Sequence, residues 1–92
     1  MHYVYMIRCE DGSFYTGYST DPERRFKEHL SGKGAKYTRS HKPVELVMQC
    51  LCMDKSAALK LEARIKNLSH EEKVILLREY KKLDGENIEE RV

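Results

Sequence analysis

The chain of 92 residues contains no tryptophan, two prolines and three cysteines, and it lacks any long hydrophobic run. An odd number of cysteines without C-x-x-C spacing argues against a disulfide scaffold or a zinc ribbon. Apolar runs such as residues 74–77 are far shorter than the roughly 20 residues of a membrane-spanning helix. No basic segment followed by an apolar stretch opens the chain, so we expect no signal peptide. These absences predict a single domain in the reducing cytoplasm, without membrane association.

The net charge of +2 hides an uneven distribution of charged residues. Residues 24–42 contain seven Lys and Arg and one acidic residue, Glu28, whereas residues 84–92 contain four acidic residues and one Arg. A basic segment of this kind is typical of a surface that faces a polyanion. The alternative is a solvated loop whose lysines serve solubility, and the charge alone favours that alternative.

The first part of the chain predicts a β-hairpin. Residues 3–8 and 14–19 are rich in aromatic and β-branched residues, and an acidic turn that ends in Gly12 joins them. A three-residue loop with Gly12 in the left-handed region would put Tyr5 and Tyr15 on the same face of the sheet. A two-residue loop would put them on opposite faces, because side chains alternate along a strand. We expect the three-residue loop.

A helix is predicted directly after the hairpin. Asp21 followed by a proline is typical of a helix start, and the helix should run to about Leu30. Phe26 and Leu30 are four residues apart and should face the core. Arg25 and His29 are also four apart and should form an adjacent stripe at the helix edge.

The remaining chain predicts a loop, a strand and two further helices. Residues 31–42 are a basic, glycine-containing loop, residues 44–53 a third strand that is central or half covered, and residues 55–68 a second helix. Ser69 begins a capping box, which predicts a third helix. That helix should fade before an acidic and disordered tail over residues 84–92.

Two aromatic tripeptides, Tyr3-Val4-Tyr5 and Tyr15-Thr16-Gly17, lie on the hairpin strands. Arg25 follows ten residues after the second tripeptide begins, His29 lies one helical turn later, and Glu62 falls in the second helix. In this order the residues closely resemble the motifs of the GIY-YIG nuclease family. The chain is most similar to the small standalone bacterial members of that family.

The resemblance implies a fold and an activity. The fold is an α+β domain over residues 1–83, a three-stranded antiparallel sheet flanked by helices in the order β-β-α-β-α-α. The activity is hydrolysis of phosphodiester bonds in nucleic acid with one divalent metal ion, Mg²⁺ or Mn²⁺. Site residues carried over from the family motifs are the catalytic Tyr5, Tyr15, Arg25 and His29, and the metal ligand Glu62.

The chemistry of these side chains suits the implied reaction. Phosphodiester hydrolysis needs an activated water and neutralisation of charge on the phosphoryl oxygens. Arg25 offers a permanently charged, forked donor, and one carboxylate suits Mg²⁺, which completes its shell with water and substrate oxygens. The general base is either Tyr5, if a cation or Arg25 lowers its pKa, or His29. Tyr15 would position the water or a phosphate oxygen.

The expected partner is nucleic acid, DNA rather than RNA, recognised by structure rather than by sequence. Its contacts would come from the basic loop, through Lys33, Lys36, Tyr37, Arg39 and Lys42. Two alternatives stay open. The chain could be a non-catalytic nucleic-acid-binding module, or an adaptor that recruits a larger repair or recombination protein through its third helix and acidic tail.

Overall fold

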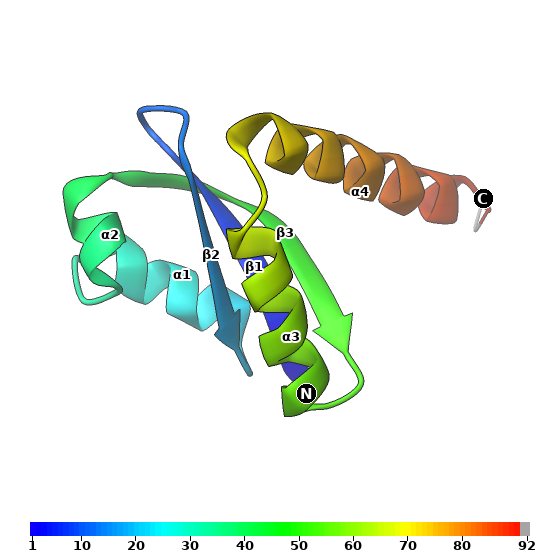
Figure 1. Cartoon of the computed structure of the whole chain (residues 1–92), viewed down its shortest axis with the longest axis horizontal. Helices are drawn as coiled ribbons and strands as arrows, with labels where there is room; N and C mark the ends of the chain where they lie inside the picture. The colour runs from blue at the N-terminus through cyan, green and yellow to red at the C-terminus, as the bar shows by residue number, and fades with distance from the viewer. Residues whose placement is uncertain (91–92) are drawn as a thin grey trace.

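A computed structural model describes the backbone of residues 1–90 and the side chains of residues 1–82. The elements along the chain are β1 (His2–Cys9), β2 (Phe14–Ser19), α1 (Pro22–Leu30), α2 (Lys36–Ser40), β3 (Pro43–Cys52), α3 (Lys55–Lys66) and α4 (His70–Glu90) (Figure 1). The expected α+β order is confirmed. The one addition is the short helix α2, which lies in the segment predicted as a loop.

The three strands form an antiparallel sheet in the order β2-β1-β3. The predicted three-residue hairpin loop is confirmed: Tyr5 pairs with Gly17, the Cys9 N–H donates to the Ser13 carbonyl at 2.8 Å, and Gly12 has a φ of +85°. Since β1 pairs on both sides, it is the central strand. The alternative of a central third strand was therefore wrong, because β3 lies at an edge.

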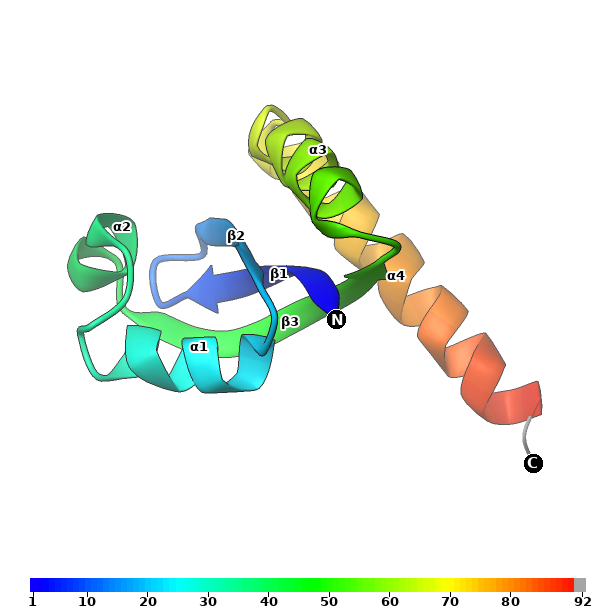
Figure 2. The same ribbon diagram turned by 90° about the horizontal axis from the view of Figure 1, so that it is seen from below.

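Helices cover both faces of the sheet, and each face has its own apolar cluster. Figure 2 shows α1 on one side of the sheet and α3 on the other. The cluster on the α3 side contains Val4, Met6 and Met48 with Ala58 and Ile65. The opposite face has a smaller cluster made of Tyr5, Ile7 and Cys9, with Tyr15, Phe26 and Leu46 packed against it. The strict alternation of strand side chains produces this division.

The inner face of α1 differs from the prediction. Phe26 packs into the core as expected, but Leu30 is 52% exposed and His29 is 1% exposed. The loop that follows α1 folds back over His29, where a Cβ at Gly34 would collide with the imidazole ring. This packing across the loop buries His29 in place of Leu30, so the prediction that Leu30 faces the core was wrong.

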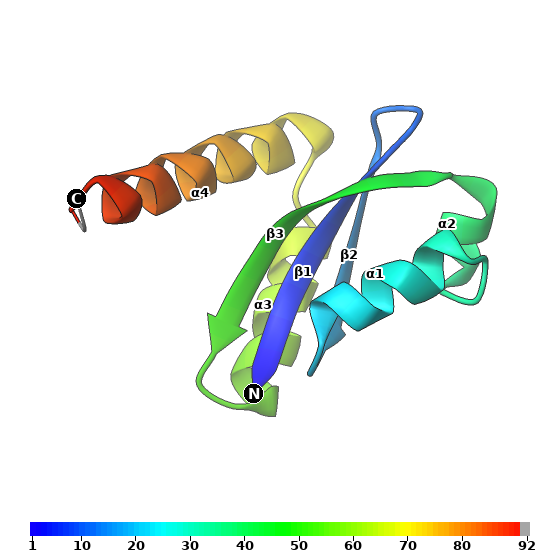
Figure 3. The ribbon, with the colours of Figure 1, turned by 180° about the vertical axis from the view of Figure 1, so that it is seen from behind.

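Helix α4 contacts the outer edge of β3 and then extends beyond the sheet (Figure 3). The Tyr80 hydroxyl donates to the Gln49 carbonyl at 3.1 Å and accepts from the Gln49 N–H at 3.4 Å. The helix continues to Glu90, through most of the stretch for which a disordered tail was expected, and residues 91–92 lie outside the described residues. The boundary at residue 83 stays a prediction. Within the described part of the chain, no helix has the length and hydropathy to cross a membrane.

Candidate active site

Tyr5 occupies the centre of the face covered by α1. Its side chain is 1% exposed, and its hydroxyl lies 2.8 Å from Nε2 of His29. The strand partner of Tyr5 is Gly17, and a Cβ at that position would lie 2.5 Å from the Tyr5 hydroxyl. The glycine of the second tripeptide therefore makes the space in which the tyrosine of the first one meets the histidine.

The second ring nitrogen of His29 is held by the segment that folds over it. Nδ1 lies 2.7 Å from Oγ1 of Thr38, whose hydroxyl in turn donates to the Ala35 carbonyl at 3.0 Å. A hydroxyl has one proton, so donation from Thr38 to Ala35 goes with an Nδ1–H on His29 and an Nε2 that accepts from Tyr5. The Ala35 N–H donates to Nδ1 at 3.4 Å, a longer and weaker bond that goes with the opposite tautomer.

Burial keeps both members of this pair uncharged at neutral pH. Burial raises the pKa of Tyr5 well above its ordinary value, the neighbouring Tyr15 raises it further, and Arg25 opposes both. Burial, followed by the charge of Arg25, lowers the pKa of His29 to about 4, against a smaller opposing effect of Glu28. Arg25 alone thus does not make Tyr5 a phenolate, and the lowered pKa makes neutral His29 a weaker base than a free imidazole.

Tyr15 and Arg25 form the more exposed part of the cluster. The Tyr15 ring centroid lies 6.2 Å from that of Tyr5 and 5.0 Å from that of His29, and its side chain is half-buried. The half-buried guanidinium of Arg25 donates through Nη1 to Oε2 of Glu28 at 2.9 Å. The structure therefore brings together Tyr5, Tyr15, Arg25 and His29 on one face of the sheet.

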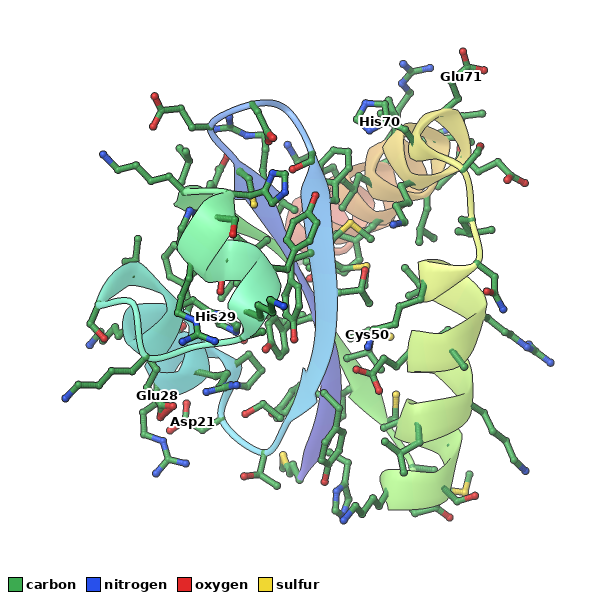
Figure 4. The ribbon with its side chains drawn as sticks, turned by 60° about the vertical axis from the view of Figure 1, so that its left-hand side comes forward. Asp21, Glu28, His29, Cys50, His70 and Glu71 are labelled. Atoms are coloured by element: carbon green, nitrogen blue, oxygen red, sulfur yellow. The ribbon has the colours of Figure 1, made fainter. Side chains whose placement is uncertain are left out.

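Glu62 lies on α3, which packs over the other face. Its side chain is 17% exposed, and its carboxylate is 3.2 Å from the ammonium of Lys66. Figure 4 shows the edge strand β2 with α1 and α2 on one side and α3 on the other. Within the described side chains, no hydrogen bond joins Glu62 to the tyrosines, and no three His, Cys, Asp or Glu side chains gather as a metal-binding cluster.

The predicted nucleic-acid contacts lie around α2. All five side chains are exposed: Lys33, Lys36, Tyr37, Arg39 and Lys42. No side chain caps the N-terminus of α2. Its five residues contain no Gly or Pro, but the sequence has no capping motif that would predict a helix there. This is why the segment reads as a loop in the sequence. The helix places two of the basic residues, Lys36 and Arg39, on regular backbone.

Three residues that matter to the geometry were missed by sequence reasoning. Glu28 pairs with Arg25 through an (i, i+3) spacing, which the sequence could have indicated. Thr38 and Gly34 reach His29 across the loop. Nothing in the local sequence indicates that contact, because it forms only once α2 has folded back onto α1.

Comparisons with known proteins identify the family of this chain. Residues 1–74 match the GIY-YIG catalytic domain. The UPF0213 protein SSP2268 of Staphylococcus saprophyticus is 49% identical over 78 residues, which cover 85% of this chain and 95% of that protein.

Two solved structures are also similar. The solution NMR structure of the UPF0213 protein BH0048 from Bacillus halodurans is 49% identical, with a TM-score of 0.55 and coverage of 84% of this chain and 82% of that one. The solution NMR structure of EF2693 from E. faecalis is 42% identical, with a TM-score of 0.59 and coverage of 87% and 85%. The chain therefore belongs to the GIY-YIG family, whose catalytic domain is associated with nucleases.

Proposed function

We propose that this protein is a metal-dependent endonuclease that hydrolyses phosphodiester bonds in nucleic acid, DNA rather than RNA, at sites marked by structure rather than by sequence. The observation that carries the proposal is the 2.8 Å contact between the Tyr5 hydroxyl and His29 Nε2. The Tyr15 ring and the Arg25 guanidinium lie next to this pair. A buried tyrosine hydroxyl needs a hydrogen-bond partner, and here that partner is a side chain that can also take up a proton.

The proton acceptor in this proposal is the Tyr5–His29 pair acting together. Water loses a proton to the Tyr5 oxygen while the Tyr5 proton moves to Nε2 of His29, and the hydroxide oxygen forms the new bond to phosphorus as the bond to the leaving oxygen breaks. The leaving oxygen takes a proton from solvent, and His29 gives up its proton through Tyr5, which restores the neutral pair. This transfer requires the tautomer in which Nδ1 carries the proton and donates to Oγ1 of Thr38, 2.7 Å away. Tyr15, the more exposed tyrosine, would position that water or a phosphate oxygen.

Arg25 neutralises charge on the phosphoryl group in this scheme. Its guanidinium has five N–H donors in a planar fork, which matches the geometry of phosphate oxygens. One of those donors is engaged by Glu28. Phosphate binding therefore competes with, or shares, the Arg25–Glu28 ion pair.

A divalent ion fits this site only if most of its ligands come from water and substrate. The donor set offers one half-buried carboxylate, Glu62, and no group of three His, Cys, Asp or Glu side chains forms a metal-binding cluster among the described side chains. Mg²⁺ accepts such sites, because it keeps several waters and binds phosphate oxygens directly. When bound, the ion would lower the pKa of water and offset phosphate charge. Lys66 has to release Glu62 for that ion.

The test is cleavage of nicked, flapped and linear DNA, and of RNA with the same sequences, in Mg²⁺ or Mn²⁺. The wild type should cut at least one DNA structure, whereas Glu62→Ala should not. Tyr5→Phe should lower the rate by roughly 100-fold or more. Tyr80→Phe, which removes a hydrogen-bonded hydroxyl at the distant β3 edge, is the matched control and should cut normally. Wild-type cleavage no faster than that of Glu62→Ala on every substrate would refute the nuclease.

A non-catalytic nucleic-acid-binding module is the second candidate. Its support is the exposure of the five basic-segment residues, in contrast to Tyr5 and His29, which are both 1% exposed. Such a module would bind DNA with a steep salt dependence and without any response to metal. The adaptor alternative depends on residues 84–92, whose side chains lie outside the described residues. A pulldown with and without those residues tests it, and identical partners would remove it.

A further inference from the structure

A stack of two rings extends the tyrosine cluster toward solvent. The Tyr37 and His41 rings are nearly parallel, with an interplanar angle of 13° and centroids 4.0 Å apart. Tyr37 also lies 6.1 Å from the Tyr15 ring. The Tyr37 residue and the His41 side chain are each 36% exposed. An aromatic series therefore runs from the candidate catalytic cluster to the surface.

The outer ring of this series is held in place. His41 Nδ1 lies 2.7 Å from Oδ2 of Asp11, in the turn between β1 and β2. The other carboxylate oxygen of Asp11 accepts from the Ser13 N–H at 3.0 Å and from the Ser13 hydroxyl at 2.6 Å. These bonds join two loops that are far apart in the sequence. A ring fixed in this way loses little conformational freedom when another planar group stacks on it.

His41 also lines a cavity of about 370 Å³. Its other lining residues are Glu10, Asp11, Ser40 and Lys42. The two carboxylates disfavour a phosphate inside the cavity and can accept from the N–H groups of a nucleobase. The phosphate backbone would instead follow the exposed Arg39 and Lys42, of which Lys42 lines the cavity and lies 4.0 Å from Glu10. Aromatic rings beside basic side chains are the arrangement by which proteins bind unpaired bases.

We propose that the Tyr37–His41 pair and its cavity bind one unpaired nucleobase of the substrate, next to the phosphodiester bond that is cut. The inference rests on the proposed nuclease function and specifies its substrate class, a nucleic acid with an unstacked nucleotide beside the scissile bond. A paired base stacks on its own neighbours and does not reach such a platform. The protein would then recognise the structure of its substrate rather than the base sequence, because every base has a π-face that can stack.

The experiment compares two single-stranded DNA oligomers of equal length and charge, one normal and one with a central abasic site, bound to ¹⁵N-labelled protein. The normal oligomer should bind tighter by roughly five-fold or more, and the amide shifts should concentrate at residues 10–13 and 37–42. RNA of the same sequence forms a third arm. Equal affinity for the normal and abasic DNA would overturn the proposal.

Variants separate stacking from folding. His41→Ala should remove the discrimination between the two oligomers, whereas His41→Phe should keep it because the second ring is preserved. His2→Ala is the matched control, since His2 stacks on Tyr18 at another part of the sheet, and it should change nothing. Discrimination that survives in a folded His41→Ala protein contradicts the proposal. If His41→Ala does not fold, the His41→Phe variant decides. Loss of the discrimination between the two oligomers in His41→Phe would contradict the proposal.

The nuclease and the stacking site can fail separately. Base-dependent binding that His41→Ala removes, without any cleavage by the wild type, keeps the stacking site and rejects the nuclease. Cleavage by the wild type with equal affinity for normal and abasic DNA keeps the nuclease and rejects the stacking site.

Discussion

Oε2 of Glu28 lies 2.9 Å from Nη1 of Arg25, so a carboxylate already occupies one donor of the guanidinium that the proposed reaction needs for phosphate. Both side chains project from α1, and Arg24 lies 3.9 Å from the other oxygen of Glu28. The positive charge at this part of the site is therefore partly compensated before any nucleic acid binds.

Removal of that carboxylate should strengthen nucleic-acid binding. We expect Glu28→Gln to lower the Kd for DNA by roughly two- to five-fold, the range of an exposed ion pair, and to steepen the salt dependence. Fluorescence anisotropy at several salt concentrations measures both quantities. Glu23→Gln, at an exposed position on the same helix, is the control. Equal gains for the two variants would mean that net charge, not release of Arg25, is responsible.

The buried His29 should make stability depend on pH. Its pKa is lowered from 6.5 to about 4 in the folded state, so the unfolded chain binds the proton more readily. The contribution of neutral His29 to the free energy of unfolding is then fully present above pH 6.5. It is lost as the pH drops toward 4, by up to about 3 kcal/mol. Urea unfolding from pH 7 to pH 4 measures this loss, and His29→Gln should reduce it. An NMR titration in which the His29 ring protonates near pH 6.5 would contradict the expectation.

The ion pair between Lys66 and Glu62 should compete with a divalent cation. Lys66→Met frees the carboxylate, so the Mn²⁺ concentration for half-maximal cleavage should fall by roughly two- to five-fold. Lys60→Met changes an exposed lysine on the same helix and serves as the control. Chelation of the ion should abolish cleavage in all three proteins. An unchanged Mn²⁺ requirement in Lys66→Met would remove Glu62 from the proposed ion site.

The close approach of Gly34 to His29 predicts a folding defect. A Cβ at Gly34 would collide with the imidazole ring and push the loop away from α1. We expect Gly34→Ala to cost about 1–3 kcal/mol of unfolding free energy, as overpacked cores do. Denaturant unfolding measures it, with Lys33→Ala, at the exposed neighbouring position, as the control. A Gly34→Ala protein as stable as the wild type would show that the loop relaxes freely.

The sequence was most informative where structure is local. Alternation along β1 and β2, together with Gly12 in the turn, correctly predicted that Tyr5 and Tyr15 share a face. The helix starts were equally local: Asp21 accepts from the N–H of Arg24, and Ser69 accepts from that of Glu72, as the cap motifs indicate. These features depend on neighbours within a few residues, and a single sequence contains that information.

Features that depend on distant segments were not accessible in the same way. The apolar spacing of α1 favoured Leu30 as a core residue, but the fold of the loop over the helix selected His29. Thr38 and His41 make their contacts with residues far away in the sequence, His29 and Asp11. The position of Glu62 relative to the tyrosines depends on how α3 lies at the edge strand, which no periodicity in the chain encodes.

The hydroxyl of Tyr80 has a consequence for self-association. It satisfies the outward N–H and carbonyl of Gln49, so a foreign strand cannot extend the sheet at that point of β3 without displacing α4. The outer edge of β2 pairs with no strand among the described residues, and it is the strand that carries Tyr15. A peptide strand that adds to the sheet at this edge would therefore lie beside the tyrosine cluster.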